Sequence, residues 1–206
     1  MSADVEFWFE FGSNYSYLSV MRIGDEARQR GLSVAWRPFL LGPIFKAFGW
    51  DNSPFVLQKE KGAYVWRDMA RLCAKYDLGW TVPSAFPRNG VLAARIALAG
   101  EGADWQEAFC REVMLRNFVE DRDISTPESM TEILTGLGLD AAPILAAAQA
   151  EPVKARLRAL TEEAQTRKIF GAPTFFVGDE MFWGNDRMED ALDWAVAHSP
   201  LRKKTT

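Results

Sequence analysis

Residues 5–17 read VEFWFEFGSNYSY, which divides into a strand-like run, a tight turn and the start of a helix. The run at 5–11 is rich in aromatic residues and alternates only in part, so we expect a central strand covered on both faces. A helix is predicted over residues 15–30. Ser13 and Ser16 stand three positions apart at its start, where a redox protein of this layout would carry two cysteines. Such a turn forms no disulfide, but it can hold a thiolate that belongs to another molecule.

The two ends of the chain are predicted to complete one sheet. Residues 33–39 are typical of a second strand, which would lie parallel to the first after a right-handed crossover. Residues 173–177 and 180–183 are typical of two further strands joined by a glycine–aspartate turn, and a helix over 187–197 follows them. A βαβ unit and a ββα unit together make a thioredoxin-like α/β fold.

The segment between these units has an almost wholly helical pattern. It is too long for a loop, so we expect a large all-helical insertion subdomain over 41–168 and a thioredoxin-like domain made of 1–40 and 169–206. The predicted helices cover 64–76, 90–99 and 105–117, with further helices that begin at Ser125 (in capping-box spacing with Glu128), near Pro143 and near Pro152.

Composition and charge exclude several classes of function. The chain has 206 residues, and 48% of them are hydrophobic, so it is globular with a sizeable buried core. Its net charge of −4 argues against a nucleic-acid partner and against an acidic membrane surface. The basic cluster at 202–204 is interpreted as a solvated tail. No run approaches the ~18 apolar residues that a membrane span needs.

The cysteines and the histidine give further limits. Cys73 and Cys110 form no short-spaced pair, so we expect both to be buried and reduced. No signal peptide is predicted, and the location is expected to be cytoplasmic, where glutathione is abundant and reduced. His198 is the one histidine and is interpreted as an inert surface residue. That argues against a serine–histidine–aspartate hydrolase, and no metal site is expected.

Ser13 has two interpretations. A serine between a strand and a helix is most often an N-cap, whose oxygen accepts an N–H of the first turn. The same hydroxyl can donate to a thiolate, and the N–H groups of a helix start favour an anion. Ser16 lies one turn further on and is expected to be structural.

Ala172 and Pro173 begin the third predicted strand. A proline there is often only an entry residue. In a thioredoxin-like fold this position faces the active-site turn and its proline is cis. The N–H and C=O of Ala172 can then pair with a peptide ligand as an added strand would.

Asn185 and Asp186 follow the fourth strand and are expected to start the last helix. In a second interpretation, the Asp186 carboxylate binds the ammonium of a ligand, and the helix start binds the adjacent carboxylate of the same ligand. A γ-glutamyl group carries both of these charges. From spacing alone, Asn52 and Lys61 are typical of a surface turn and a solvated lysine.

Six short motifs carry a family resemblance: FEFGSNYSY at 9–17, RPFLLG at 37–42, NSP at 52–54, KG at 61–62, GAPTF at 171–175 and FWGNDR at 182–187. In this order and at these spacings, they resemble the glutathione-dependent 2-hydroxychromene-2-carboxylate isomerases and the related kappa-class glutathione transferases of the DsbA-like thioredoxin superfamily. The chain departs from that family at Asn14, where a proline is usual, and at Gly12, which is smaller than usual.

The resemblance implies reduced glutathione as cofactor, a small aromatic substrate, a role in aromatic-compound degradation and a homodimer. It implies a thiolate that adds to a conjugated carbon, a rotation about the resulting single bond, and elimination. A kappa-class transferase or peroxidase and a non-catalytic glutathione-binding protein remain alternatives, whereas Ser13 and Ser16 exclude the usual disulfide exchange. The site residues that it implies are Ser13 for the thiolate, Asn52 and Lys61 for the glutathione and substrate site, Ala172 with cis Pro173 for the backbone clamp, and Asn185 with Asp186 for the γ-glutamyl end.

Overall fold

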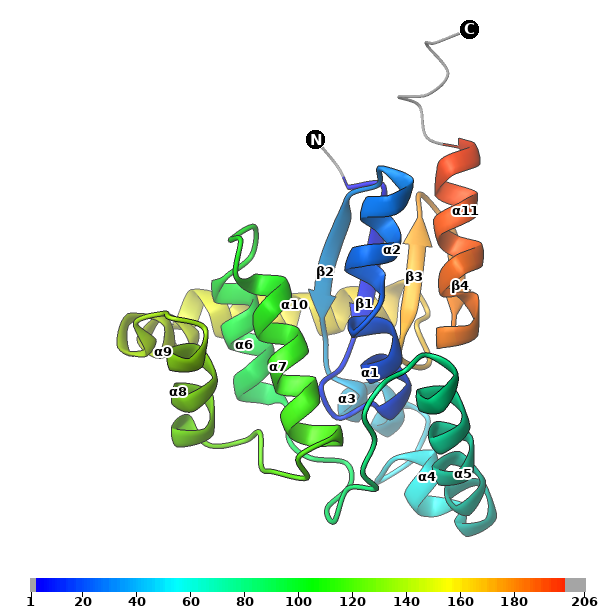
Figure 1. Cartoon of the computed structure of the whole chain (residues 1–206), viewed down its shortest axis with the longest axis horizontal. Helices are drawn as coiled ribbons and strands as arrows, with labels where there is room; N and C mark the ends of the chain where they lie inside the picture. The colour runs from blue at the N-terminus through cyan, green and yellow to red at the C-terminus, as the bar shows by residue number, and fades with distance from the viewer. Residues whose placement is uncertain (1–2, 199–206) are drawn as a thin grey trace, which may run out of the picture.

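The computed structural model describes residues 3–198 and has one four-stranded sheet in the order β2-β1-β3-β4 (Figure 1). β1 and β2 are parallel, with Phe7 opposite Trp36, whereas β3 is antiparallel to both β1 and β4. This is the predicted thioredoxin-like sheet. The strands are β1 (Val5–Phe9), β2 (Val34–Pro38), β3 (Thr174–Val177) and β4 (Glu180–Trp183).

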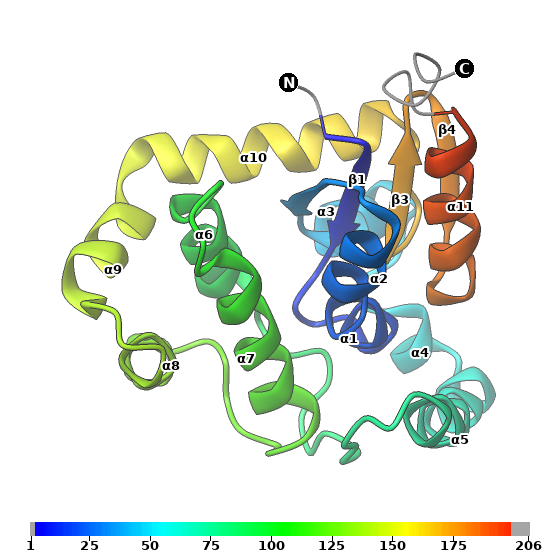
Figure 2. The same cartoon turned by 45° about the horizontal axis from the view of Figure 1, so that its top comes forward.

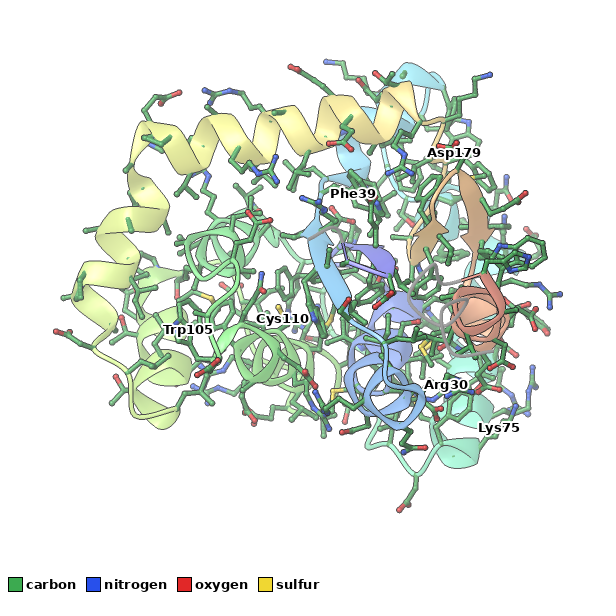
Figure 3. The ribbon with its side chains drawn as sticks, turned by 90° about the horizontal axis from the view of Figure 1, so that it is seen from above. Arg30, Phe39, Lys75, Trp105, Cys110 and Asp179 are labelled. Carbon is green, nitrogen blue, oxygen red and sulfur yellow. The ribbon has the colours of Figure 1, made fainter. Side chains whose placement is uncertain are left out.

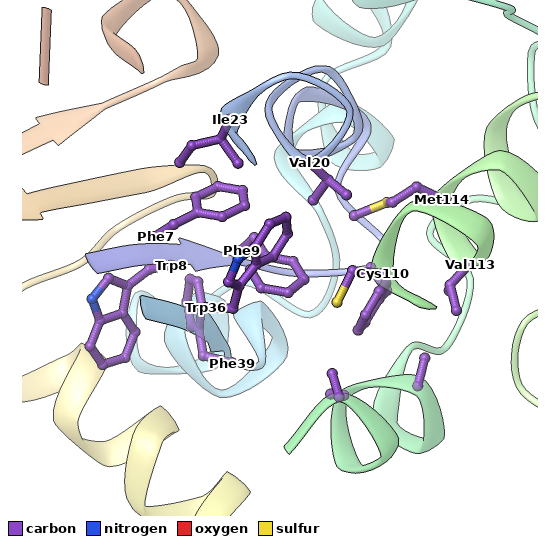
Figure 4. Packing of buried hydrophobic residues seen from close by; sticks show 14 of the residues in the cluster. Phe7, Trp8, Phe9, Val20, Ile23, Trp36, Phe39, Cys110, Val113 and Met114 are labelled. Carbon is purple, nitrogen blue, oxygen red and sulfur yellow. The ribbon is translucent and has the colours of Figure 1, made fainter. Parts of the chain in front are cut away.

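β1 is one of the two internal strands, and its side chains are buried on both faces. Phe7 packs against Phe175 with ring centroids 5.2 Å apart, while Trp8 points to the opposite face and contacts Phe39 at 6.0 Å (Figure 4). Phe7, Trp8 and Phe9 are all fully buried. The partial alternation of this strand is therefore explained, because hydrophobic residues are required on both of its faces.

Helices cover both faces of the sheet. α10 runs along one face, and α2 and α11 lie on the other (Figures 2 and 3). α6 and α10 contact β2, and α4 and α5 lie beyond the end of the sheet near α1. The helices are α1 (Asn14–Val20), α2 (Ile23–Arg30), α3 (Leu41–Ala47), α4 (Pro54–Leu57), α5 (Lys59–Lys75), α6 (Val91–Ala99), α7 (Gln106–Phe118), α8 (Pro127–Gly136), α9 (Ala141–Gln149), α10 (Glu151–Thr166), the 3₁₀ turn η1 (Asn185–Arg187) and α11 (Met188–His198).

Three sequence-based expectations about helices were wrong in detail. The single helix predicted at 15–30 is two helices, because the Arg22 N–H bonds to Ser19 O and closes a turn between them. Thr126, and not Ser125, caps α8, since its side chain accepts from the Ser129 N–H. The helix predicted from residue 64 begins at Lys59, after a four-residue helix.

The segment 41–168 contributes helices and no strand among the residues described. The proposed domain limits at 40/41 and 168/169 stay a prediction, and the basic cluster at 202–204 lies outside the described residues. Within 3–198, no helix is both long and apolar enough to cross a bilayer. Cys73 and Cys110 are free and buried, as predicted.

Candidate active site

A cleft of about 1160 Å³ opens where β1 ends. Its wall begins with the turn after β1 and continues with the segments that follow β2 and β4 and that precede β3, so four strand ends meet around it. α4, α5 and a loop before α6 complete the wall. Of the predicted site residues, Ser13, Asn52, Lys61, Ala172, Asn185 and Asp186 line the cleft. Pro173 is buried and is not one of the lining residues.

Ser13 joins the two halves of the sheet. Its Oγ accepts from the Ser16 N–H at 3.2 Å, so Ser13 is the N-cap of α1, as predicted. The same hydroxyl donates to the Ala172 carbonyl at 3.0 Å, across 159 positions of sequence. A hydroxyl has one proton to give. A ligand atom that draws this proton must therefore replace the Ala172 carbonyl as its acceptor.

Ser16 is structural, as predicted, but its partner lies outside the helix. It is fully buried, and its Oγ accepts from the Glu10 N–H at 3.4 Å. This bond ties the start of α1 to the end of β1. Ser16 therefore fixes the turn that carries Ser13.

The Ala172–Pro173 peptide bond is cis, as predicted, and a second cis bond, which the sequence did not reveal, joins Phe86 to Pro87. A Cβ at Gly171 would lie 2.5 Å from the Trp183 Nε1, so only glycine lets this indole lie directly against the chain beside Ala172. Phe170 stacks obliquely on Trp183 with ring centroids 4.7 Å apart, and both line the cleft.

Asn185 and Asp186 have different surroundings. Asn185 is buried, and its Oδ1 accepts from the Ser19 hydroxyl at 3.2 Å and from Arg22 at 3.4 Å. The side chain of Asp186 is 75% exposed at the cleft wall, so its carboxylate is open to a ligand. The expectation that one of them caps the last helix was wrong. η1 intervenes before α11, and no side chain caps the start of η1.

Asn52 precedes α4 and Lys61 belongs to α5, and both residues line the cleft. The Asn52 Oδ1 accepts from the Ser53 N–H at 2.7 Å, which orders the turn before α4. The Lys61 Nζ lies 5.8 Å from the Phe55 ring centroid. Both side chains are exposed at the cleft, where they can meet an anionic ligand.

Sequence reasoning missed two titratable residues of the cleft. Burial raises the pKa of Glu10 to about 7, and the Leu41 N–H, which donates to Oε1 at 3.2 Å, opposes that rise. Burial and its hydrogen bond to Asp68, 2.9 Å long, raise the pKa of Tyr15. A carboxyl at the end of an aromatic strand was the available signal for Glu10, because burial beside aromatic side chains desolvates such a group and raises its pKa.

Comparison with known proteins agrees with this geometry. The DsbA-like thioredoxin domain matches residues 4–194. A 2-hydroxychromene-2-carboxylate isomerase from Sphingobium xenophagum is 30% identical over 92% of this chain and 96% of its own length. A solved structure of a 2-hydroxychromene-2-carboxylate isomerase superposes with a TM-score of 0.80 at 28% identity, covering 97% of each chain. Glutathione S-transferase kappa 2 from Caenorhabditis elegans is 24% identical over 97% of this chain and 96% of its own. The chain therefore belongs to the DsbA-like thioredoxin family, together with the 2-hydroxychromene-2-carboxylate isomerases.

Proposed function

We propose that this protein is a glutathione-dependent cis–trans isomerase of 2-hydroxychromene-2-carboxylate or a similar aromatic, unsaturated keto acid. One observation carries the proposal: a serine hydroxyl and the carbonyl before a cis-proline meet in the cleft, at the position where a redox relative would hold a disulfide. The names of the relatives supply the substrate class.

The residues of the cleft suit reduced glutathione. Asp186 offers an exposed carboxylate to the ligand ammonium, and Ala172 offers a peptide group that can pair with the ligand backbone. Ser13 offers the hydroxyl. When bound, glutathione supplies a thiolate that adds reversibly to the conjugated carbon of the substrate, so that the former double bond can rotate.

The contribution of Ser13 is to stabilise negative charge on sulfur. In the structure its proton goes to the neutral Ala172 carbonyl, whereas a thiolate beside it forms the stronger, charge-assisted bond. The Ser16 N–H continues to hold the Ser13 oxygen during that exchange, so the hydroxyl turns without moving. Lys61 holds the substrate carboxylate, and Phe170 with Trp183 offers an aromatic surface to the substrate ring.

The test is calorimetric titration with reduced glutathione, with Asp186→Ala and a matched control, Asp190→Ala. Asp190 is also an exposed acid near the start of α11, and both acids pair with Arg187, but Asp190 does not line the cleft. We expect Asp186→Ala to weaken binding at least tenfold and Asp190→Ala to leave it unchanged. Absence of binding heat from the wild type, together with a silent equilibrium dialysis, would remove glutathione from the proposal.

A kappa-class transferase activity is the second candidate, and the relative from Caenorhabditis elegans favours it. The two reactions differ in their glutathione balance, because an isomerase returns glutathione unchanged and a transferase consumes it in a conjugate. Free thiol measured before and after complete turnover separates them.

Location and assembly complete the proposal. We place the protein in the cytoplasm, a choice that two free, buried cysteines support. The homodimer is carried over from the family resemblance, and light scattering on the purified protein tests it.

A further inference from the structure

Glu10 stands at the opposite end of the turn that carries Ser13. The Ser13 N–H donates to the Glu10 carbonyl at 3.1 Å, which closes a four-residue turn. In such a turn the first and last Cα atoms are less than about 7 Å apart. Both side chains line the cleft. The turn therefore brings the Ser13 hydroxyl and the Glu10 carboxyl to the same end of the cleft.

The Glu10 carboxyl is anchored by one oxygen only. Oε1 accepts from the Leu41 N–H at 3.2 Å, while Oε2 forms no hydrogen bond with any residue from 3 to 198. Oε2 lies 3.9 Å from the place that a Cβ on Gly12 would occupy. The Arg88 carbonyl oxygen lies only 2.9 Å from the same place, so glycine there lets the loop before α6 pack beside Glu10. Oε2 has no hydrogen bond within the described residues and belongs to a residue that lines the cleft, so it is available to a ligand there.

No cation neutralises Glu10 within the described part of the chain. Arg88, from the loop before α6, is engaged by Asn117 and Asp121, and Asp68 of α5 is engaged by Tyr15 and Arg71. The other titratable side chains that face the cleft are equally without a hydrogen bond or ion pair to Glu10: Asp51 before α4, Lys61 and Tyr64 of α5, and Asp186 and Arg187 of η1. The polar contact of the carboxyl is with a backbone N–H, and its charge is set by burial.

We propose that Glu10 is the base of this cleft and that its Oε2 takes the thiol proton of bound glutathione. The inference rests on the proposed function. In the step, the S–H bond breaks with its electron pair left on sulfur, and an O–H bond forms at Oε2. The carboxyl keeps that proton while the thiolate is in use and returns it to sulfur before glutathione leaves. No proton is gained or lost over the cycle.

Two features make Glu10 suited to this task. Ser13 can stabilise a thiolate but cannot take up its proton, because the hydroxyl is a donor in that interaction. A thiol with an ordinary pKa near 8.5 is mostly protonated at neutral pH, so a proton must go either to a group of the cleft or to solvent when the cleft holds the thiolate. Burial places the pKa of Glu10 at about 7, which is the range where a general base works best near neutral pH.

The experiment counts protons released when glutathione binds, by calorimetry in buffers of different ionisation enthalpy at pH 6 and pH 8. Wild type is compared with Glu10→Gln, which keeps an acceptor for the Leu41 N–H, and with Glu10→Asp, which keeps the carboxyl. S-methylglutathione, which has no thiol proton, is the control ligand. Thermal unfolding confirms that each variant is folded.

The proposal predicts that wild type releases about one proton per glutathione at pH 6 and nearly none at pH 8, because an ionised Glu10 then retains the thiol proton. Glu10→Gln should release more than about one half of a proton per glutathione at both pH values, since the thiol proton of glutathione then goes to solvent. Glu10→Asp should behave as wild type, and S-methylglutathione should release none.

Equal proton release by wild type and Glu10→Gln at both pH values would overturn the role of Glu10 and leave glutathione binding intact. If wild type binds glutathione with no proton released at pH 6, the thiol stays protonated, and the thiolate step itself is wrong. Absence of binding by wild type removes the proposed function. Should Glu10→Gln not fold, the wild-type fall in proton release from pH 6 to pH 8, against S-methylglutathione, decides.

Discussion

Two buried asparagines invite a matched test of what an unpartnered amide costs. Asn14 and Asn117 are both 1% exposed. The Asn117 Nδ2 donates to the Phe11 carbonyl at 2.9 Å, and its Oδ1 accepts from Arg88 at 2.9 Å. Neither the Oδ1 nor the Nδ2 of Asn14 has a hydrogen-bond partner among the residues described. The same substitution should therefore change stability in opposite directions at the two sites.

The expected magnitudes follow from these contacts. A buried polar group without a partner costs about 1–3 kcal/mol, and Asn14 has two such groups, while truncation also loses some packing. We expect Asn14→Ala to raise the free energy of unfolding by about 1–3 kcal/mol. Asn117→Ala removes one partner from a backbone carbonyl and one from a guanidinium, so it should lower that free energy by about 2–4 kcal/mol.

Asn14→Pro extends the test. Asn14 is the first residue of α1, where proline is well tolerated, and Ser13 has φ −88° and ψ 117°, an extended conformation that suits the residue before a proline. Proline should add about 0.4–1 kcal/mol to the effect of removing the amide, through the unfolded chain.

Urea unfolding followed by tryptophan fluorescence measures all three variants. In a parallel thermal unfolding experiment, each change of 1 kcal/mol in the free energy of unfolding should move the thermal midpoint by about 2–4 °C for a chain of this size. If Asn14→Ala destabilises as much as Asn117→Ala, the Asn14 amide is hydrogen bonded in solution, and the reasoning from its unpartnered atoms is refuted.

Three further predictions concern the cleft. Ser13→Ala should lower kcat/KM for isomerisation by about 10- to 150-fold, because it removes one hydrogen bond to a charged group. It should also lower the free energy of unfolding by about 1 kcal/mol, because α1 loses its N-cap. A full isomerisation rate in steady-state kinetics would contradict the role of the serine. Gly171→Ala should displace Trp183, whose Nε1 would lie 2.5 Å from the new Cβ, and so raise KM for the aromatic substrate, whereas Ala103→Gly, outside the cleft, should not. Burial raises the pKa of Glu10 from 4.5 to about 7, so the folded state binds this proton more tightly than the unfolded state and stability falls as pH rises from 4.5 to 7. Glu10→Gln should remove that fall, so its free energy of unfolding should exceed that of the wild type by up to about 3 kcal/mol above pH 7. Urea midpoints measured across this pH range test the prediction. If the variant shows the same pH dependence of stability as the wild type, Glu10 is not the cause of the fall.

The sheet and most of the helices could be predicted because their signals are local. Residues 180–183 form a strand with the predicted bounds, since a turn signal precedes them and aromatic residues fill them. The break at Arg22 has no glycine or proline to mark it, and it depends on contacts with Asn185 and Glu189 at the other end of the chain. The raised pKa of Glu10 likewise depends on burial, which only the folded chain creates. Ser13 and Ala172 were foreseen as a pair because the predicted thioredoxin-like fold and the family resemblance both bring their motifs together, not because either motif points to the other.

The bond pattern of β1 has a consequence during protein synthesis. β1 pairs on one edge with β2, which leaves the ribosome soon after it, and on the other with β3, where Phe7 faces Phe175, a separation of 175 − 7 = 168 residues. At about 5–20 residues per second, the second edge of β1 waits roughly 8 to 34 seconds for its partner. Until then a strand with three aromatic residues in a row has an open edge, which is the feature that promotes aggregation of nascent chains. The helical segment between the strands therefore sets a delay in the completion of the sheet as well as a cleft wall.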